Sequence, residues 1–266
     1  MVKIAVYAVR YTENIQPFID HYYSGIGVKE AEEANNLSLT IINNFGVLPD
    51  YPGITILNNV VRPDFSTGHL ARNWNQAIIN SFRDLRNPAV DCLVLIQIDA
   101  KFNNDWYNNI CSLPTDCYYL AVGRGDEMQF MRPEVIRQVG LYDERFCNIG
   151  YQEADYFFRA RLKIKNNCII LDEYHKRYHD PYNGKFKEND FIIKSVDSSN
   201  IPSHKLSSVH HPISRNIFKY KWGNVYPEYW DTQIELFNSL NGDFTNNKHF
   251  MFYPYFEKDI DQKNYI

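Results

Sequence analysis

The segment that decides the fold runs from Cys92 to Trp106 and reads CLVLIQIDAKFNNDW. Its first half is almost wholly apolar, which is typical of a strand buried on both faces of a sheet. The apolar run ends abruptly at Asp99-Ala100-Lys101. A carboxylate at the mouth of a buried strand is a candidate ligand-binding group, because ligands of such sheets bind beyond the strand ends.

The sequence on both sides of this strand alternates between strands and helices. Short apolar runs predict further strands at residues 3–9, 37–45, 54–60, 118–123 and 167–174. Apolar residues near helical spacing predict helices at 14–23, 68–85, 132–140 and 151–163. This alternation indicates an α/β fold, with a mainly parallel, twisted sheet and helices on both faces. From about Asp180 the pattern weakens, and neither a repeat nor a clear linker divides the chain.

Composition and charge argue against several classes of protein. The chain has 266 residues, a formal net charge of −4 and a pI near 6.1, without the basic excess of a nucleic-acid-binding protein. No run of about 18 apolar residues predicts a transmembrane helix, and the first residues lack the pattern of a signal peptide. The five cysteines form no CxxC pair, which favours reduced thiols and a cytoplasmic location.

Three stretches, in this order, resemble family-two glycosyltransferases of the GT-A fold. The strand that ends in QIDAKF occupies the place of that family's Asp-x-Asp motif. The second stretch, residues 128–162, has the family's residue types at the family's spacing: Val139-Gly140, Tyr142-Asp143-Glu144, Gln152-Glu153-Ala154-Asp155 and Arg159. The third stretch, VHHPISRNIFKYKWGN at residues 209–224, is similar to a late histidine followed by a Tyr-x-Lys-Trp-Gly segment.

The resemblance implies transfer of a sugar from a nucleotide-diphosphate donor, UDP above others, to a glycan or other hydroxyl acceptor with inversion. It implies a GT-A-like catalytic domain at residues 1–223, with an aromatic extension at 224–266 packed on it. The tail HFMFYPYF at residues 249–256 offers a surface for a second subunit. The alternative function is an inactive module of the same fold that binds a nucleotide sugar or glycan, because both family motifs are altered here.

The altered Asp-x-Asp motif leaves the donor's diphosphate with two possible partners. The resemblance implies that Asp99 binds the donor through a divalent cation, Mn²⁺ or Mg²⁺, completed by His210 or His211. Lys101 stands where the family has a second carboxylate, and it cannot bind a metal while charged. It would instead meet the phosphates directly, or point outward.

The altered second motif places Glu153 where the family has its aspartate base, which takes the acceptor's proton as the new bond forms. Asp155 is the alternative base. A further interpretation is that Asp155 and Arg159 form an ordinary i,i+4 helix pair.

Further donor and acceptor contacts follow from the family's arrangement. Tyr7 and Arg10, at the end of the first strand, lie where the family binds the nucleotide base. Arg72 and Asn73 begin a helix, in a GHLARN segment similar to the helix start of the family's nucleotide half. Trp222 would line the acceptor cleft. Structural interpretations stay open for each: Tyr7 in the core, Arg72 solvated, and Trp222 fastening the tail to the sheet.

Overall fold

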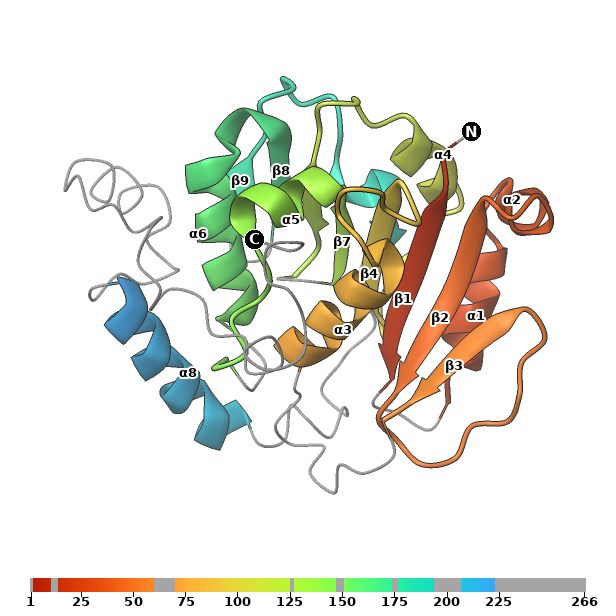
Figure 1. The fold of residues 1–266 in the computed structure, drawn as a ribbon, viewed down its shortest axis with the longest axis horizontal. Coiled ribbons are helices and arrows are strands. Elements are labelled where there is room, and N and C mark those ends of the chain that lie inside the picture. Colours follow the sequence, from red (N-terminus) through yellow and green to blue (C-terminus); the bar gives the residue numbers. More distant parts are fainter. Residues whose placement is uncertain are drawn as a thin grey trace.

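A sheet of eight strands forms the centre of the described chain in a computed structural model (Figure 1). The structure describes residues 2–10, 14–59, 70–124, 127–146, 151–173, 177–193 and 207–222, with side chains of residues 212–219 in the last range. The strand order is β3-β2-β1-β4-β7-β6-β8-β9. The strands are β1 (Ile4–Arg10), β2 (Leu37–Asn43), β3 (Ile54–Asn58), β4 (Cys92–Gln97), β6 (Tyr119–Val122), β7 (Met128–Met131), β8 (Cys168–Asp172) and β9 (Arg177–His179).

Most neighbouring strands in this sheet run parallel. The parallel pairs are β3-β2, β2-β1, β1-β4 and β6-β8. Strand β7 runs antiparallel to both β4 and β6, and β9 runs antiparallel to β8. The strands β1, β2, β3, β4, β6 and β8 therefore all point the same way, and their carboxyl ends meet at one edge of the sheet.

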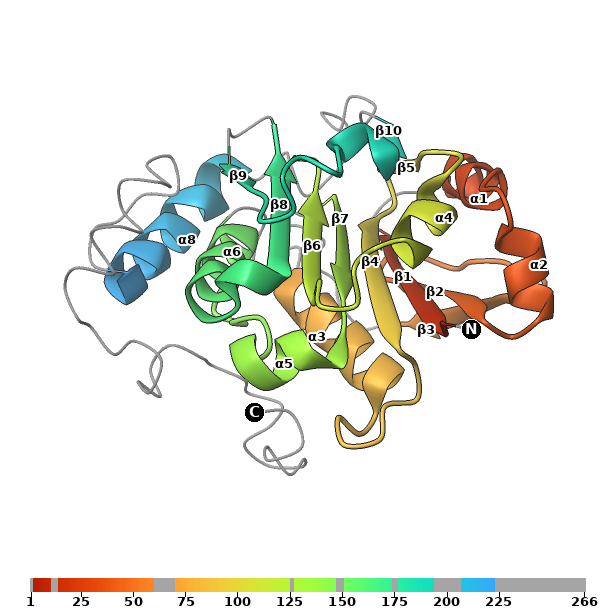
Figure 2. The same ribbon diagram turned by 90° about the horizontal axis from the view of Figure 1, so that it is seen from above.

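Helices cover both faces of the sheet, as the sequence predicted (Figure 2). In β1, Ala5, Tyr7 and Val9 face one core, whereas Ile4, Val6 and Ala8 face the other. This alternation follows from the two-residue period of a strand. The first core lies under α3 (Leu70–Phe82), α5 (Pro133–Val139) and α6 (Gln152–Lys163). The second lies under α1 (Gln16–Tyr23), α2 (Val28–Glu33) and α4 (Trp106–Cys111).

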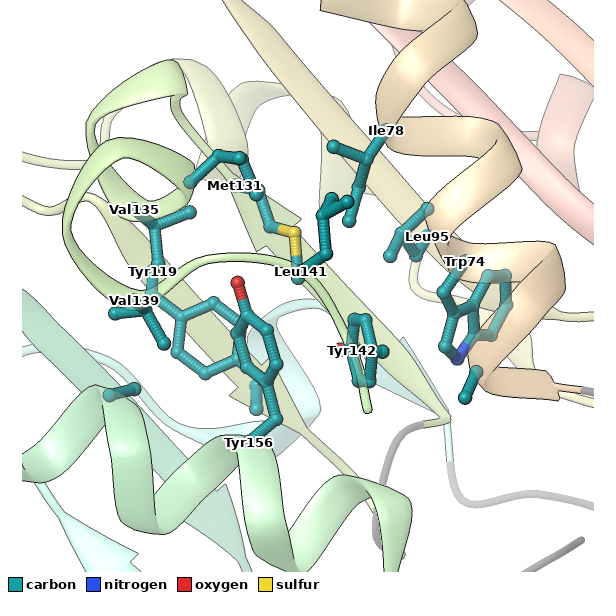
Figure 3. Close-up of a cluster of buried hydrophobic side chains, with 14 of the residues drawn as sticks. Trp74, Ile78, Leu95, Tyr119, Met131, Val135, Val139, Leu141, Tyr142 and Tyr156 are labelled. Atoms are coloured by element: carbon teal, nitrogen blue, oxygen red, sulfur yellow. The ribbon is translucent and has the colours of Figure 1, made fainter. Parts of the chain in front are cut away.

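The first core joins the two halves of the sheet (Figure 3). Trp74 and Ile78 of α3 pack from one side, and Tyr156 of α6 packs from the other. Tyr142 stacks on Tyr156 with ring centroids 4.2 Å apart. The hydroxyls of Tyr119 and Tyr142 both donate to Oε1 of the buried Gln129, so polar atoms also fix this packing.

The chain turns sharply after β4 and begins a small second sheet. The backbone N–H of Ala100 donates to the carbonyl of Gln97 at 3.0 Å, which closes this turn. Strand β5 (Lys101–Phe102) then pairs antiparallel with β10 (Ile192–Ile193). Phe102 is buried and stacks on Trp106 with ring centroids 4.2 Å apart. Because Phe102 is held in the core, the position of Lys101 at the start of β5 is fixed as well.

The final described element is the helix α8 (Ser207–Trp222), which lies beside α6 in both views (Figures 1 and 2). The sequence did not predict this helix. Its Phe218 is fully buried and packs against Phe146, Tyr151 and Phe158. Residues 224–266, the predicted aromatic extension, lie outside the described residues. Among the described helices, none combines the length and hydrophobicity that a bilayer crossing requires.

Candidate active site

Two of the predicted site residues lie at the same edge of the sheet. Asp99 follows β4, whose carboxyl end points to this edge. Glu153 is the second residue of α6 and approaches Arg177, which begins β9 opposite the end of β8. Strands β7 and β6 separate β4 from β8, so their axes are about 14 Å apart at the usual strand spacing. An extended ligand can span that interval.

Asp99 sits half-buried in the turn after β4. Burial raises the pKa of the Asp99 carboxyl above its ordinary value, and a hydrogen bond with its own backbone N–H opposes the shift. Desolvation disfavours the charged form when no nearby cation compensates. A cation bound here would supply that compensation.

The turn after β4 also explains why a lysine follows Asp99 two residues later. Asp99 lies in the turn, whereas Lys101 begins β5, so the two side chains do not share one strand face. Lys101 pairs in register with Ile193, which is 44% exposed. The neighbouring pair, Phe102 and Ile192, is buried. Because strand side chains alternate, Lys101 lies on the exposed face of the small sheet.

Glu153 is a buried carboxylate with one oxygen left over. Glu153 as a whole residue is 7% exposed. Its Oε1 lies 3.5 Å from Nη2 of Arg177. Its Oε2 is buried and has no hydrogen-bond partner in the described part of the structure. A buried acceptor without a donor costs free energy, so this oxygen is a candidate for a contact that the free protein does not supply.

The residue that holds Glu153 was not predicted from the sequence. Arg177 donates from Nε to Oδ2 of Asp172 at 2.8 Å, and its Nη2 lies 2.7 Å from the same oxygen. Asp172 and Arg177 are opposite one another in the antiparallel β8-β9 pair. Opposite charges in LDEYHKRYHD were the available signal, but only the pairing of these strands reveals that Asp172 and Arg177 are in contact.

Asp155, the alternative base, forms the predicted helix pair with Arg159. Nε of Arg159 donates to Oδ2 of Asp155 at 3.0 Å, and the Asp155 side chain is fully buried. Nη1 of Arg159 donates to the carbonyl of Val139 at 2.9 Å, which ties α6 to α5. This geometry supports a structural role for Asp155.

Tyr7 and Arg10 are both buried on β1. Tyr7 belongs to the core under α3. Nη1 of Arg10 donates to Oδ1 of Asn43 at 2.7 Å and also to the carbonyl of Phe45. Nδ2 of Asn43 donates in turn to Oδ1 of Asn58 at 2.7 Å. The carboxyl ends of β1, β2 and β3 are therefore joined by Arg10 and by two asparagines, Asn43 and Asn58, that were not among the predicted site residues.

Arg72 and Asn73 lie in the first turn of α3, but both have protein partners there. Nε of Arg72 donates to Oε2 of Glu144 at 3.2 Å. Asn73 is fully buried, and its Oδ1 accepts from Nδ2 of Asn59 at 3.2 Å. Arg72 keeps 30% side-chain exposure, so it is the member of the pair that a ligand can still reach.

His210, His211 and Trp222 belong to α8, but their side chains lie outside the described residues. The backbone of α8 is positioned by Phe218, which packs on Tyr151 immediately before α6. Among the described residues, no group of three or more histidine, cysteine, aspartate or glutamate side chains is arranged to hold a metal ion. Any metal held by Asp99 would therefore need further ligands.

Comparison with solved structures identifies the class of fold. S. aureus TarS has a TM-score of 0.50 and 9% identity, over 98% of this chain and 46% of that one. The TarS 1–349 fragment in complex with UDP has a TM-score of 0.50 and 9% identity, over 98% of this chain and 76% of that one. A mutant of Drosophila β1,4-galactosyltransferase 7 in complex with manganese, UDP-Gal and xylobiose has a TM-score of 0.43 and 12% identity, over 74% of this chain and 72% of that one. This chain thus spans about half the length of full TarS.

These neighbours are GT-A-type glycosyltransferases, and the chain has the GT-A fold that the sequence predicted. At 9% identity, the likeness to TarS shows the fold alone. No protein-family model matches the chain. No curated protein matches it either.

Proposed function

We propose that this protein is an inverting glycosyltransferase that uses a nucleotide-diphosphate sugar. The observation that carries the proposal is the Glu153 carboxylate, which is buried, bound through one oxygen only, and located at the sheet edge that also holds Asp99. An inverting transferase needs two such groups, one at the donor's diphosphate and one at the acceptor's hydroxyl. We assign Asp99 to the diphosphate and Glu153 to the acceptor hydroxyl, and their place at one edge of the sheet supports this assignment.

Glu153 would act as the base. The acceptor hydroxyl donates a hydrogen bond to Oε2 and then transfers its proton as the acceptor oxygen forms a bond to the anomeric carbon. The bond from that carbon to the donor's phosphate oxygen breaks in the same displacement, and the nucleoside diphosphate leaves. Attack from the face opposite the leaving group inverts the anomeric centre.

Asp99 would hold the donor's diphosphate through a divalent cation, which neutralises the charge that develops on the leaving group. The rise in the pKa of this carboxyl through burial fits a group that functions beside a cation. Lys101 is a further candidate to meet the phosphates directly, and His210 or His211 is a candidate to complete the metal site. Tyr7, Arg10 and Arg72 are proposed donor contacts, and Trp222 is a proposed acceptor contact. UDP is the favoured nucleotide, since TarS has been solved with it.

The test is incubation of the protein with a panel of UDP-, GDP- and TDP-sugars, with and without Mn²⁺, followed by detection of released nucleoside diphosphate. We expect turnover with at least one donor, and inversion in the NMR spectrum of any product. Glu153→Gln should lower kcat by about 10²- to 10⁴-fold, the usual contribution of a general base. Its melting temperature should stay close to that of the wild type.

The matched control is Glu134→Gln, which removes an exposed glutamate paired with Arg137 on α5. This change should leave turnover unaltered. Unchanged turnover in Glu153→Gln would remove Glu153 from the mechanism. A rise in melting temperature with a nucleotide sugar, without any turnover, would support the inactive binding module instead.

A further inference from the structure

We propose that Arg177 is a positioning residue that holds Glu153 in the orientation needed for proton transfer. This inference rests on the proposed function. Arg177 lies on β9 and Glu153 on α6, and their side-chain exposures are 3% and 9%. The contact between Nη2 and Oε1, at 3.5 Å, is the described ion pair of Glu153.

Arg177 is itself fixed from two sides. Its Nε and Nη2 both lie within 2.8 Å of Oδ2 of Asp172, which is fully buried at the end of β8. Its guanidinium also lies over the ring of Phe157, 5.2 Å from the centroid. Cation–π contact and a short charged hydrogen bond both restrict the side chain. The cation is therefore held in place before any substrate binds.

The unequal distances decide what Arg177 does to Glu153. Arg177 approaches Asp172 closely, at 2.7 Å, and Glu153 at 3.5 Å. A close fork-like pair with Glu153 would occupy both carboxylate oxygens and compete with the acceptor's proton. The observed contact involves Oε1, whereas Oε2 has no hydrogen-bond partner among the described residues. Asp172 thus keeps the guanidinium from closing on Glu153.

The backbone before Glu153 supports the same conclusion. Tyr151, directly before α6, has a φ of 71°, in the left-handed region that non-glycine residues seldom adopt. Strained backbone persists where the surrounding structure over-determines it, and such residues cluster at active sites. Tyr151 determines the direction in which α6 begins, and Arg177 determines the position of the Glu153 carboxylate.

The test compares Arg177→Lys in two backgrounds. Lysine keeps the positive charge but, as a single compact ammonium, cannot reproduce the planar fork that bridges two carboxylates. We expect kcat to fall about 10- to 100-fold with the donor's KM unchanged, because misplacement of a reacting group acts on the chemical step. In the Glu153→Gln background, Arg177→Lys should have no further effect on kcat. Arg137→Lys, in the exposed pair with Glu134, is the matched control and should keep full activity.

The possible outcomes separate this inference from the proposed function. Equal losses from Arg177→Lys with and without Glu153 would overturn the inference, and so would full activity or a changed donor KM. Absence of turnover in the wild type would overturn the proposed function and the inference together. If Arg177→Lys does not fold, Asp172→Asn combined with Arg177→Met removes both charges of the tight pair. That variant should show the same loss of kcat at unchanged donor KM, and full activity would overturn the inference.

Discussion

The charged residues at the carboxyl edge of the sheet differ in how they affect the stability of the folded protein. Asp99 loses hydration without a compensating cation among the described residues, and Glu153 buries an oxygen without a donor. Asp155 is more deeply buried, but its charge is satisfied by Arg159. For stability alone, an uncharged residue would be better than Asp99 or Glu153. Groups that cost stability in the free protein are candidates for binding or chemistry, whereas well-paired groups are candidates for structure.

Asp99→Asn should stabilise the free protein near neutral pH and weaken its binding of UDP and Mn²⁺. The folded-state pKa of Asp99 is raised, so the folded form retains the proton to higher pH than the unfolded form. Stability contributed by this group is therefore present at acid pH and falls as pH rises through the folded-state pKa. Asparagine does not titrate, so its advantage should appear at pH 7 and shrink towards pH 3.

Thermal melting at both pH values measures this difference, and calorimetric titration with UDP and Mn²⁺ measures binding. Loss of a charged contact should weaken binding about 10- to 100-fold. A variant that is less stable than the wild type at pH 7, or that binds UDP and Mn²⁺ unchanged, would contradict the assignment of Asp99.

Asp155→Asn should instead destabilise the protein. Breaking a buried pair leaves the Arg159 charge uncompensated, at a cost of about 3–5 kcal/mol. Denaturant unfolding should show this loss, while Glu134→Gln at the exposed pair on α5 should change stability by less than about 1 kcal/mol. A small effect at Asp155, together with a large loss of kcat, would make Asp155 the base in place of Glu153.

Among the elements, apolar periodicity predicted the segments with a clear local pattern and missed those that depend on tertiary contacts. The strands β1, β2, β3, β4, β6 and β8 and the helices α1, α3, α5 and α6 have apolar patterns that define them locally. Strand β9 has only three residues, RYH, and exists because it pairs with β8. The helix α8 contains Pro212 and is mostly polar, so tertiary contact at Phe218 overrides its weak local signal.

Phe218→Ala should release α8 from α6. Truncation of a buried phenylalanine costs about 3–5 kcal/mol, and here the lost contacts are those that dock one helix. Hydrogen exchange of the amides in residues 207–222 should accelerate roughly 100-fold or more, with the strands little affected. Ile213→Ala, on an exposed position of the same helix, is the control. Equal protection of α8 in both variants would contradict this docking.

In the molecule as a whole, strand direction explains why two of the predicted site residues lie at one edge of the sheet. Asp99 and Glu153 are 54 positions apart in the sequence, but parallel strands place their carboxyl ends at one edge whatever their order. The resemblance to family-two glycosyltransferases was therefore enough to nominate both residues. It could not reveal the Asp172–Arg177 pair, the turn that separates Asp99 from Lys101, or the partners of Arg72, because these depend on register and side-chain packing.

The central claim is that a donor diphosphate binds beside Asp99, with Glu153 facing the acceptor from the same edge. A crystal structure of the protein soaked with UDP and Mn²⁺ tests it most directly. We expect the diphosphate beyond the carboxyl end of β4, with the Asp99 carboxylate contacting the metal or a phosphate and the Glu153 carboxylate facing the same space. A nucleotide bound at another face of the sheet, or an Asp99 carboxylate without contact to metal or phosphate, would contradict it.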